Sequence, residues 1–164
     1  MKNLFLIAAI LFSLNTQAQN NAKPVLEIVN YDQLKEIIEV EDDVLYVINF
    51  WATWCKPCID ELPGFMEVNE IYKDDPKFKM ILVSLDQAKA IDSRVKKFIE
   101  KNNINVDVYI LDDNKRMNEW IPAFDENWSG AIPATVFYKN KKKILFRELE
   151  ITKYELEDMV DDNL

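Results

Sequence analysis

The chain alternates between short apolar runs and longer segments in which apolar residues recur every three or four positions. Continuous apolar runs of four to eight residues indicate buried strands, and the wider spacing indicates helices with one buried face. The predicted strands are residues 25–29, 44–51, 79–85, 106–111, 134–138 and 143–149. The predicted helices are residues 31–40, 56–73, a segment around 91–99, a weak helix at 114–121 and a helix that follows Thr152.

Local signals sharpen several of these elements. Thr152 and Glu155 have the spacing of a capping box, which predicts the start of the last helix. Residues 139–142 are expected to connect the last two strands as a hairpin, with Asn140 in a left-handed turn conformation. Pro63 is expected to kink the helix over 56–73. The order of elements is typical of an α/β domain with a mixed central β-sheet.

The N-terminus has the pattern of a secretory signal. Lys2 precedes an almost wholly apolar run of eleven residues (4–14), and a small-residue site ends at Ala18. This combination predicts a signal peptide at 1–18 that is cleaved, followed by one domain at 19–164. The run is short of the roughly 20 residues that span a bilayer, so no stable membrane insertion is expected after cleavage. An uncleaved tether is the alternative.

Composition excludes several classes of function. The chain has 164 residues, a formal net charge of −9 and no histidine. The negative charge disfavours nucleic-acid binding, because phosphate backbones are repelled. The absence of histidine removes Ser-His-Asp and Cys-His nucleophiles and histidine-ligated zinc. The remaining chemistry depends on cysteine, carboxylate, lysine, tyrosine or backbone groups.

The only two cysteines, Cys55 and Cys58, lie between a predicted buried strand and a predicted helix. A thiolate at Cys55 is stabilised by the unpaired N–H groups and the positive end of the helix, and Lys56 adds a nearby cation. Pro57 suits the first helical turn because it lacks an N–H. Cys58 lies one turn inside, where it is shielded and can attack a mixed disulfide formed at Cys55.

An inert disulfide and a zinc site account for the cysteine pair less well. A disulfide between neighbours in the chain closes almost no loop, so it would stabilise the fold little. A zinc site needs about four ligands, and two thiolates without histidine or further cysteine fall short. The pattern therefore favours a redox-active dithiol that needs neither a metal nor an organic cofactor. A peroxidase is disfavoured because no separate peroxidatic cysteine exists.

The chain resembles the thioredoxin fold, and specifically the exported TlpA/ResA-type thiol–disulfide oxidoreductases. The resemblance rests on Trp54 with the Cys-x-x-Cys element after a buried strand, on Pro63 eight residues after the first cysteine, on the segment 132–135 (Ile-Pro-Ala-Thr), and on the last helix. An extra βα segment at about 91–111 also fits this subgroup, and the resemblance covers residues 25–164. It implies a thioredoxin-like fold in which helices flank the mixed sheet and this βα unit is inserted.

The resemblance implies that the Ile132–Pro133 bond is cis and lies beside the cysteines. The Ile132 backbone could then pair with an extended substrate segment, and Trp54 and Pro57 would also contact substrate. An ordinary trans proline that opens a strand is the alternative. Trp54 and Trp128 could form an apolar rim for a peptide, or they could pack in the core.

The sequence departs from thioredoxin at the buried acid six residues before the first cysteine, where Asn49 stands. Glu61, six residues after Cys55, matches instead an acidic residue of ResA-type proteins. A carboxylate there could transfer the proton of Cys58 and raise the thiol pKa values. A solvated glutamate, or one that interacts with the helix dipole, is the alternative.

The expected function is thiol–disulfide exchange between the Cys55–Cys58 pair and protein thiols or disulfides, in the reductase direction. The expected location is the periplasm, with an upstream membrane or periplasmic electron donor. The oxidant direction stays open because the cysteine spacing does not set the reduction potential. The alternative function is a thioredoxin-like binding or scaffold module with a passive disulfide.

Overall fold

The computed structural model describes residues 23–164, so the predicted signal peptide lies outside the described residues. Among the described helices, none is both long and apolar enough to cross a membrane. Residues 23–164 form six strands: β1 (Leu26–Val29), β2 (Leu45–Trp51), β3 (Phe78–Ser84), β4 (Asp107–Leu111), β5 (Ala134–Lys139) and β6 (Lys142–Arg147). The α-helices are α1 (Tyr31–Ile38), α2 (Lys56–Tyr72), α3 (Lys96–Lys101), α4 (Met117–Phe124) and α5 (Lys153–Asp161).

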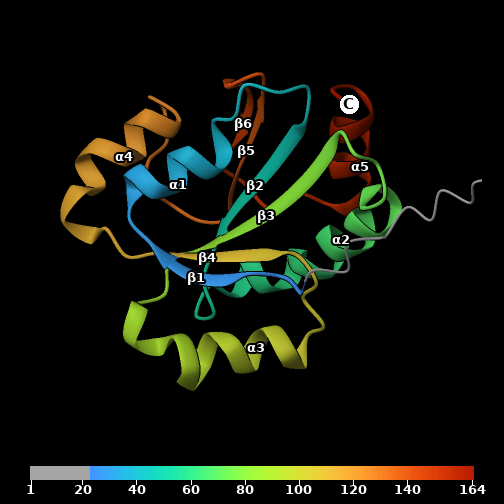
Figure 1. Cartoon of the computed structure of the whole chain (residues 1–164). Helices are drawn as coiled ribbons and strands as arrows, with labels where there is room; N and C mark the ends of the chain where they lie inside the picture. The colour runs from blue at the N-terminus through green and yellow to red at the C-terminus, as the bar shows by residue number, and fades with distance from the viewer. Residues whose placement is uncertain (1–22) are drawn as a thin grey trace, which may run out of the picture.

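The strands form one mixed sheet with the order β1-β4-β3-β2-β5-β6 (Figure 1). The four strands β1 to β4 run parallel to one another, whereas β5 is antiparallel to both β2 and β6. The predicted insertion forms as α3 and β4, and β4 separates β1 from β3. The inserted unit is therefore part of the central sheet.

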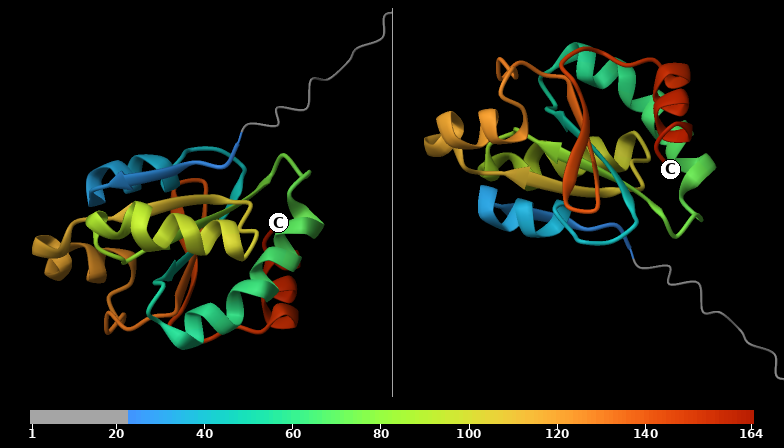
Figure 2. Two further views of the ribbon diagram at one scale, coloured as in Figure 1. Left: turned by 90° about the horizontal axis from the view of Figure 1, so that it is seen from below. Right: turned by 90° about the horizontal axis from the view of Figure 1, so that it is seen from above.

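Helices cover both faces of the sheet (Figures 1 and 2). One apolar core joins the sheet to α2, α3 and α5, and a second core joins the other face to α1 and α4. Every residue of β2 is buried. This explains its continuous apolar run, because a central strand covered on both faces has no solvent-exposed side. Since β2 is rigidly packed, its carboxyl end is a fixed platform for the cysteine pair that follows.

Two helices begin with a capping box, and one of the two boxes is predicted from the sequence. Thr152 and Glu155 form the predicted capping box, with each side chain accepting from the other residue's backbone N–H. Asn30 and Gln33 form a second box at the start of α1. These bonds satisfy N–H groups that the first helical turn leaves unpaired.

The structure refines several local predictions. The hairpin turn has two residues, because Lys139 pairs with Lys142, and both Asn140 and Lys141 have positive φ (51° and 62°). Pro63 lies inside α2, which continues past it to Tyr72. The predicted helix around 91–99 is composite, with a π-helical turn at Ile91–Val95 before α3. The predicted weak helix begins as a 3-10 turn and continues to Phe124.

Candidate active site

The cysteine pair lies where β2 passes into α2. Cys55 is the N-cap residue of α2, and it forms a disulfide with Cys58 across a Cα–Cα distance of 5.3 Å. The Cys58 backbone N–H donates to Cys55 Sγ at 3.3 Å. Cys55 is 6% exposed and Cys58 is fully buried, which confirms the predicted shielding of the second cysteine. Pro57 occupies the first turn of α2, as predicted.

The cation predicted to stabilise a thiolate is largely compensated. Lys56 Nζ pairs with Asp60 at 2.5 Å, and the lysine side chain is 80% exposed. An exposed, paired ammonium interacts weakly with other charges, because water and the partner carboxylate screen it. The N-terminus of α2 is therefore the main source of positive potential at Cys55.

A buried carboxylate holds the loop between β2 and the cysteines. Asp86, which is 2% exposed, accepts hydrogen bonds from the Thr53 backbone N–H at 2.8 Å and the Thr53 hydroxyl at 2.6 Å. The Ser84 hydroxyl donates to the same carboxylate at 3.0 Å. Since Thr53 is two residues before Cys55, these bonds fix the backbone that leads into the redox pair.

A second buried carboxylate belongs to Glu61, which is 4% exposed. Its two oxygens accept from Asn49 Nδ2 at 2.8 Å and from the Ile151 backbone N–H at 2.9 Å. Thr135 Oγ1 lies 3.1 Å from the same Asn49 nitrogen. Burial raises the pKa of the Glu61 carboxyl to about 7, although the hydrogen bonds from Ile151 and Asn49 oppose the shift. Glu61 is therefore not a solvated surface glutamate.

The Ile132–Pro133 segment precedes β5, the neighbour of β2 in the sheet, and it lies beside the redox pair. Its peptide bond is cis, and the Ile132 carbonyl oxygen lies 3.6 Å from Cys55 Sγ. In the disulfide these two atoms are in close contact without a proton between them. In the reduced protein the same geometry lets the Cys55 thiol donate to that carbonyl. The structure thus brings together residues that the sequence places 77 positions apart.

The loop that precedes this segment is held from two sides. Trp128 Nε1 donates to the Ala131 carbonyl at 2.8 Å. The Glu148 carboxylate accepts from the Ser129 backbone N–H at 3.1 Å, from the Ser129 hydroxyl, and from the Ala131 backbone N–H at 3.3 Å. These bonds hold the pKa of the Glu148 carboxyl below its usual range, with the Ser129 hydroxyl as the largest contributor.

The two tryptophans proposed as an apolar rim have different environments. Trp54 is 61% exposed beside Cys55 and is available to a partner. Trp128 is buried, and its ring lies 4.8 Å from that of Phe50 and 5.9 Å from that of Phe146. Trp128 therefore packs in the core and supports the proline loop from inside.

Asp86 and Glu148 are site residues that sequence reasoning missed. Asp86 comes directly after the predicted strand 79–85, and an acid at the carboxyl end of such a strand is a signal that could have found it. Glu148 has no comparable signal in the sequence. Within residues 23–164, no cluster of three or more Cys, Asp or Glu side chains is placed to hold a metal ion.

Comparisons with known proteins agree with this geometry. A family model described as the AhpC/TSA family matches residues 15–147. The chain belongs to the AhpC/TSA family. The thiol-disulfide oxidoreductase ResA of Oceanobacillus iheyensis is 30% identical over 153 residues, which are 86% of this chain and 74% of that relative. The thioredoxin-like protein YneN of Bacillus subtilis is 33% identical over 86 residues, which are 41% of this chain and 49% of YneN. The chain thus aligns with about half the length of that relative.

Solved structures show the same fold. A thiol:disulfide interchange protein of the thioredoxin family from Chlorobium tepidum superposes with a TM-score of 0.61 at 19% identity, covering 74% of this chain and 81% of that one. The fold is therefore thioredoxin-like, as the resemblance implied. Together with the ResA relative and the Cys55–Cys58 disulfide, this places the chain among the thiol–disulfide oxidoreductases.

Proposed function

We propose that this protein is an exported thiol–disulfide oxidoreductase that works in the reductase direction on protein substrates. The observation that carries the proposal is the position of Cys55, at the N-terminus of α2 and 3.6 Å from the Ile132 carbonyl oxygen. A thiol at a helix N-terminus has a lowered pKa, and the thiolate is the attacking species. The adjacent backbone edge provides a place for an extended substrate segment.

The proposed exchange has two steps. In the first, the Cys55 thiolate attacks one sulfur of a substrate disulfide, a mixed disulfide forms, and the other substrate sulfur leaves as a thiolate that takes up a proton. In the second, Cys58 loses its proton and attacks Cys55 Sγ, which restores the Cys55–Cys58 disulfide and releases the reduced substrate. Two electrons pass to the substrate, and an upstream donor of dithiol character must return them.

Glu61 is the group proposed to accept the proton of Cys58. It is three residues after Cys58 on α2, so the two side chains are neighbours on one helix face. A carboxyl whose pKa is about 7 exists in both protonation states near neutral pH, which suits proton transfer. Asn49 and Ile151 hold the carboxylate in place through their hydrogen bonds.

Export is part of the proposal because the N-terminal apolar run and the small-residue site at Ala18 have the pattern of a cleaved signal. Mass spectrometry of the protein purified from the periplasmic fraction should show Gln19 as the first residue. Recovery of the intact chain from the membrane fraction would instead support an uncleaved tether.

The activity is tested by reduction of insulin disulfides with dithiothreitol as the electron source. We expect the wild type to accelerate insulin precipitation and Cys55→Ser to abolish the acceleration. Equal rates for the two proteins would favour the passive scaffold. The direction is tested by equilibration of the Cys55–Cys58 pair with glutathione. A potential below that of the glutathione couple supports the reductase direction, and a higher potential contradicts it.

A further inference from the structure

The inserted segment carries a concentration of positive charge in an acidic protein. Residues 89–101 contain five basic and two acidic side chains, whereas the whole chain has a net charge of −9. Among residues 23–164, none of these five cations forms an ion pair, although nine of the other fourteen described lysines and arginines do. The positive charge of this segment is therefore not compensated by ion pairs within residues 23–164.

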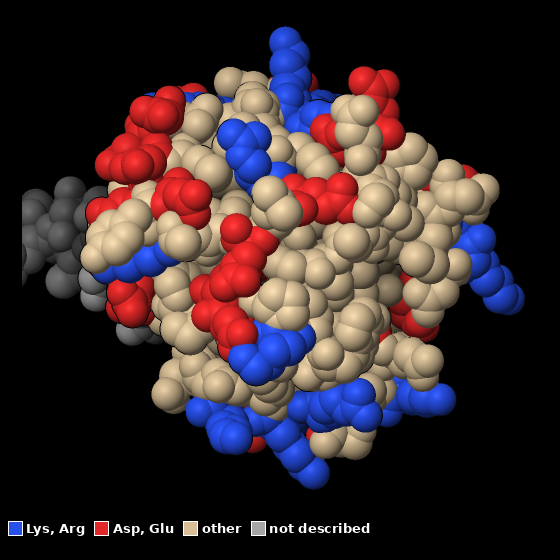
Figure 3. Space-filling view, turned by 180° about the vertical axis from the view of Figure 1, so that it is seen from behind, with Lys and Arg blue, Asp and Glu red and all other residues tan. Residues whose placement is uncertain are grey.

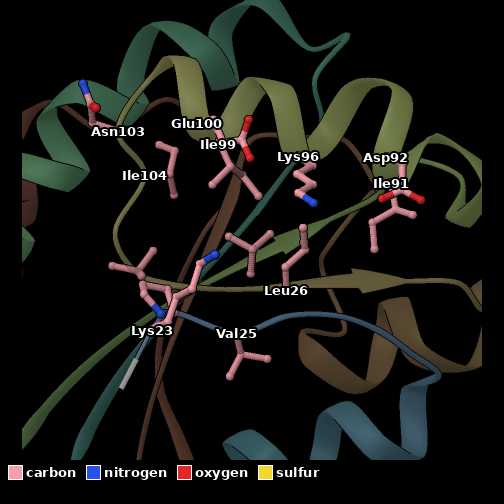
Figure 4. A pocket seen from close by; sticks show the side chains of 13 residues that line it. Lys23, Val25, Leu26, Ile91, Asp92, Lys96, Ile99, Glu100, Asn103 and Ile104 are labelled. Atoms are coloured by element: carbon pink, nitrogen blue, oxygen red, sulfur yellow. The ribbon is translucent and has the colours of Figure 1, made fainter. Parts of the chain in front are cut away.

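The two acidic residues of the segment are also exposed, but both lie on the side of the segment that borders a groove. Asp92, Glu100 and Lys96 line a groove of about 600 Å³ between α3 and β1, together with apolar side chains such as Leu26 and Ile99 (Figure 4). Four cations do not line this groove and are exposed to solvent. We call them the basic face: Lys89, Arg94, Lys97 and Lys101. In Figure 3, blue side chains gather along the lower border, on the side where Figure 1 places α3.

The helix that carries the basic face packs, through its inner side, against residues next to the redox site. Phe98 on the inner side of α3 stacks on Trp51 with ring centroids 5.1 Å apart, and Trp51 is the last residue of β2. Phe98 also shares a small cavity of about 100 Å³ with Ile59, the residue that follows Cys58. Lys89 is three residues after Asp86, whose carboxylate holds Thr53. The segment therefore packs against Trp51, which precedes the cysteine pair, and lies near Ile59, which follows it.

We propose that the basic face binds acidic segments of the protein substrates that exchange disulfides at Cys55. This inference rests on the proposed function and adds the chemical class of the substrate. Unpaired lysine and arginine side chains attract carboxylates over about a Debye length, which is about 10 Å at 0.1 M salt. Such fields raise association rates by about 10- to 1,000-fold.

A flexible acidic peptide fits this surface better than an anionic membrane does. A peptide segment can contact the basic face alone, whereas a lipid surface is flat and also meets the acidic side chains that give the chain its net charge of −9. The net charge of −9, taken by itself, would favour the binding of basic peptides. A preference for acidic peptides is therefore the opposite of what net charge alone predicts.

The test uses the reduced wild-type protein and three disulfide peptides that differ only in the residues beside the cysteine: several glutamates, several lysines, or neutral residues. Exchange rates are measured by rapid mixing at low ionic strength and at about 0.5 M salt, where the Debye length is only a few ångströms. We expect the acidic peptide to react about tenfold faster than the basic peptide at low salt. We expect this difference to disappear at high salt.

The variant Arg94→Glu/Lys97→Glu/Lys101→Glu reverses most of the basic face. It should lose about tenfold on the acidic peptide and keep its rate on the neutral one. A matched control exists in Lys115→Glu/Lys141→Glu/Lys142→Glu, which has the same change of charge at exposed cations that form no ion pair among residues 23–164. The control should keep the preference for the acidic peptide.

Several results would overturn the inference. An equal loss in the two variants would assign the effect to net charge. A basic peptide that reacts faster in the wild type would refute the basic face as a docking surface. Binding to phosphatidylglycerol vesicles without any peptide preference would assign the face to lipid, and a wild-type dimer that dissociates in the basic-face variant would assign it to self-association. If the wild type reacted with none of the peptides, the proposed function itself would fail.

Discussion

The substitution Glu61→Gln makes the most quantitative prediction, because it removes a buried group whose ionisation depends on the fold. The pKa of the Glu61 carboxyl rises from its ordinary value of 4.5 to about 7 as a result of burial. One pKa unit corresponds to about 1.4 kcal/mol, so ionising the folded protein costs roughly 3 kcal/mol more than ionising the unfolded chain. The wild type should lose that amount of stability as the pH rises.

The sign follows from proton linkage. Below about pH 4.5 the carboxyl is protonated in both states, so its full contribution to folding is present. Between about pH 4.5 and 7 the unfolded chain releases its proton first, so the free energy of unfolding falls. Above about pH 7 both states are ionised and the loss is complete. Glutamine cannot ionise, so the variant lacks this loss.

The assay is urea unfolding of the oxidised wild type and Glu61→Gln from pH 4.5 to 8. Glutamine also offers one acceptor fewer to Asn49 and Ile151, but this cost does not depend on pH and cancels in the comparison. The unfolding free energy of the variant minus that of the wild type should increase by roughly 3 kcal/mol between pH 4.5 and 8. Glu67→Gln, which removes an exposed carboxylate from the same helix, should not reproduce the change. A constant difference for Glu61→Gln, or one that favours the wild type as pH rises, would refute the reasoning.

Three further outcomes follow from the site geometry. In the reduced protein, iodoacetamide should label Cys55 before Cys58, because only Cys55 is both partly exposed and at the helix N-terminus; mass spectrometry that finds Cys58 labelled first would contradict this. Asp86→Asn should lower the unfolding free energy by about 1–3 kcal/mol in urea titrations, because the amide nitrogen cannot accept from the N–H donor it faces; an unchanged midpoint would count against it. Glu148→Ala should raise KM for peptide disulfides more than the control Glu150→Ala, because it frees the loop before the proline; equal KM values would refute this role.

Much of the fold follows from local patterns. Buried strands and capped helices are predictable because apolar periodicity and capping residues act over a few positions. The redox pair is predictable for the same reason, since a strand, two cysteines and a helix start are contiguous in the chain. The π-helical turn before α3 and the continuation of α4 through Pro122 are not predictable in this way, because packing against neighbouring elements overrides local preference there.

The state of Glu61 illustrates what sequence patterns leave open. Its position six residues after Cys55 allows either a buried acid or a solvated one. Its burial depends on the segment after β6, where the Ile151 N–H lies 90 residues away in sequence. The sequence identifies Asn49 only as a residue that cannot titrate, yet its amide donates to the Glu61 carboxylate. Asn49 occupies the strand position that carries an acid in thioredoxin, and here it donates a hydrogen bond to an acid on α2, Glu61.

The most direct test of the redox mechanism is to trap its intermediate. Cys58→Ser leaves Cys55 able to attack but removes the thiol that resolves the mixed disulfide. The reduced variant, mixed with a disulfide peptide and analysed by mass spectrometry, should accumulate a stable adduct of one peptide chain on Cys55, whereas the wild type should release reduced peptide. Absence of an adduct on Cys55 in the variant, with no peptide reduction by the wild type, would contradict the account and leave the disulfide as a passive structural link.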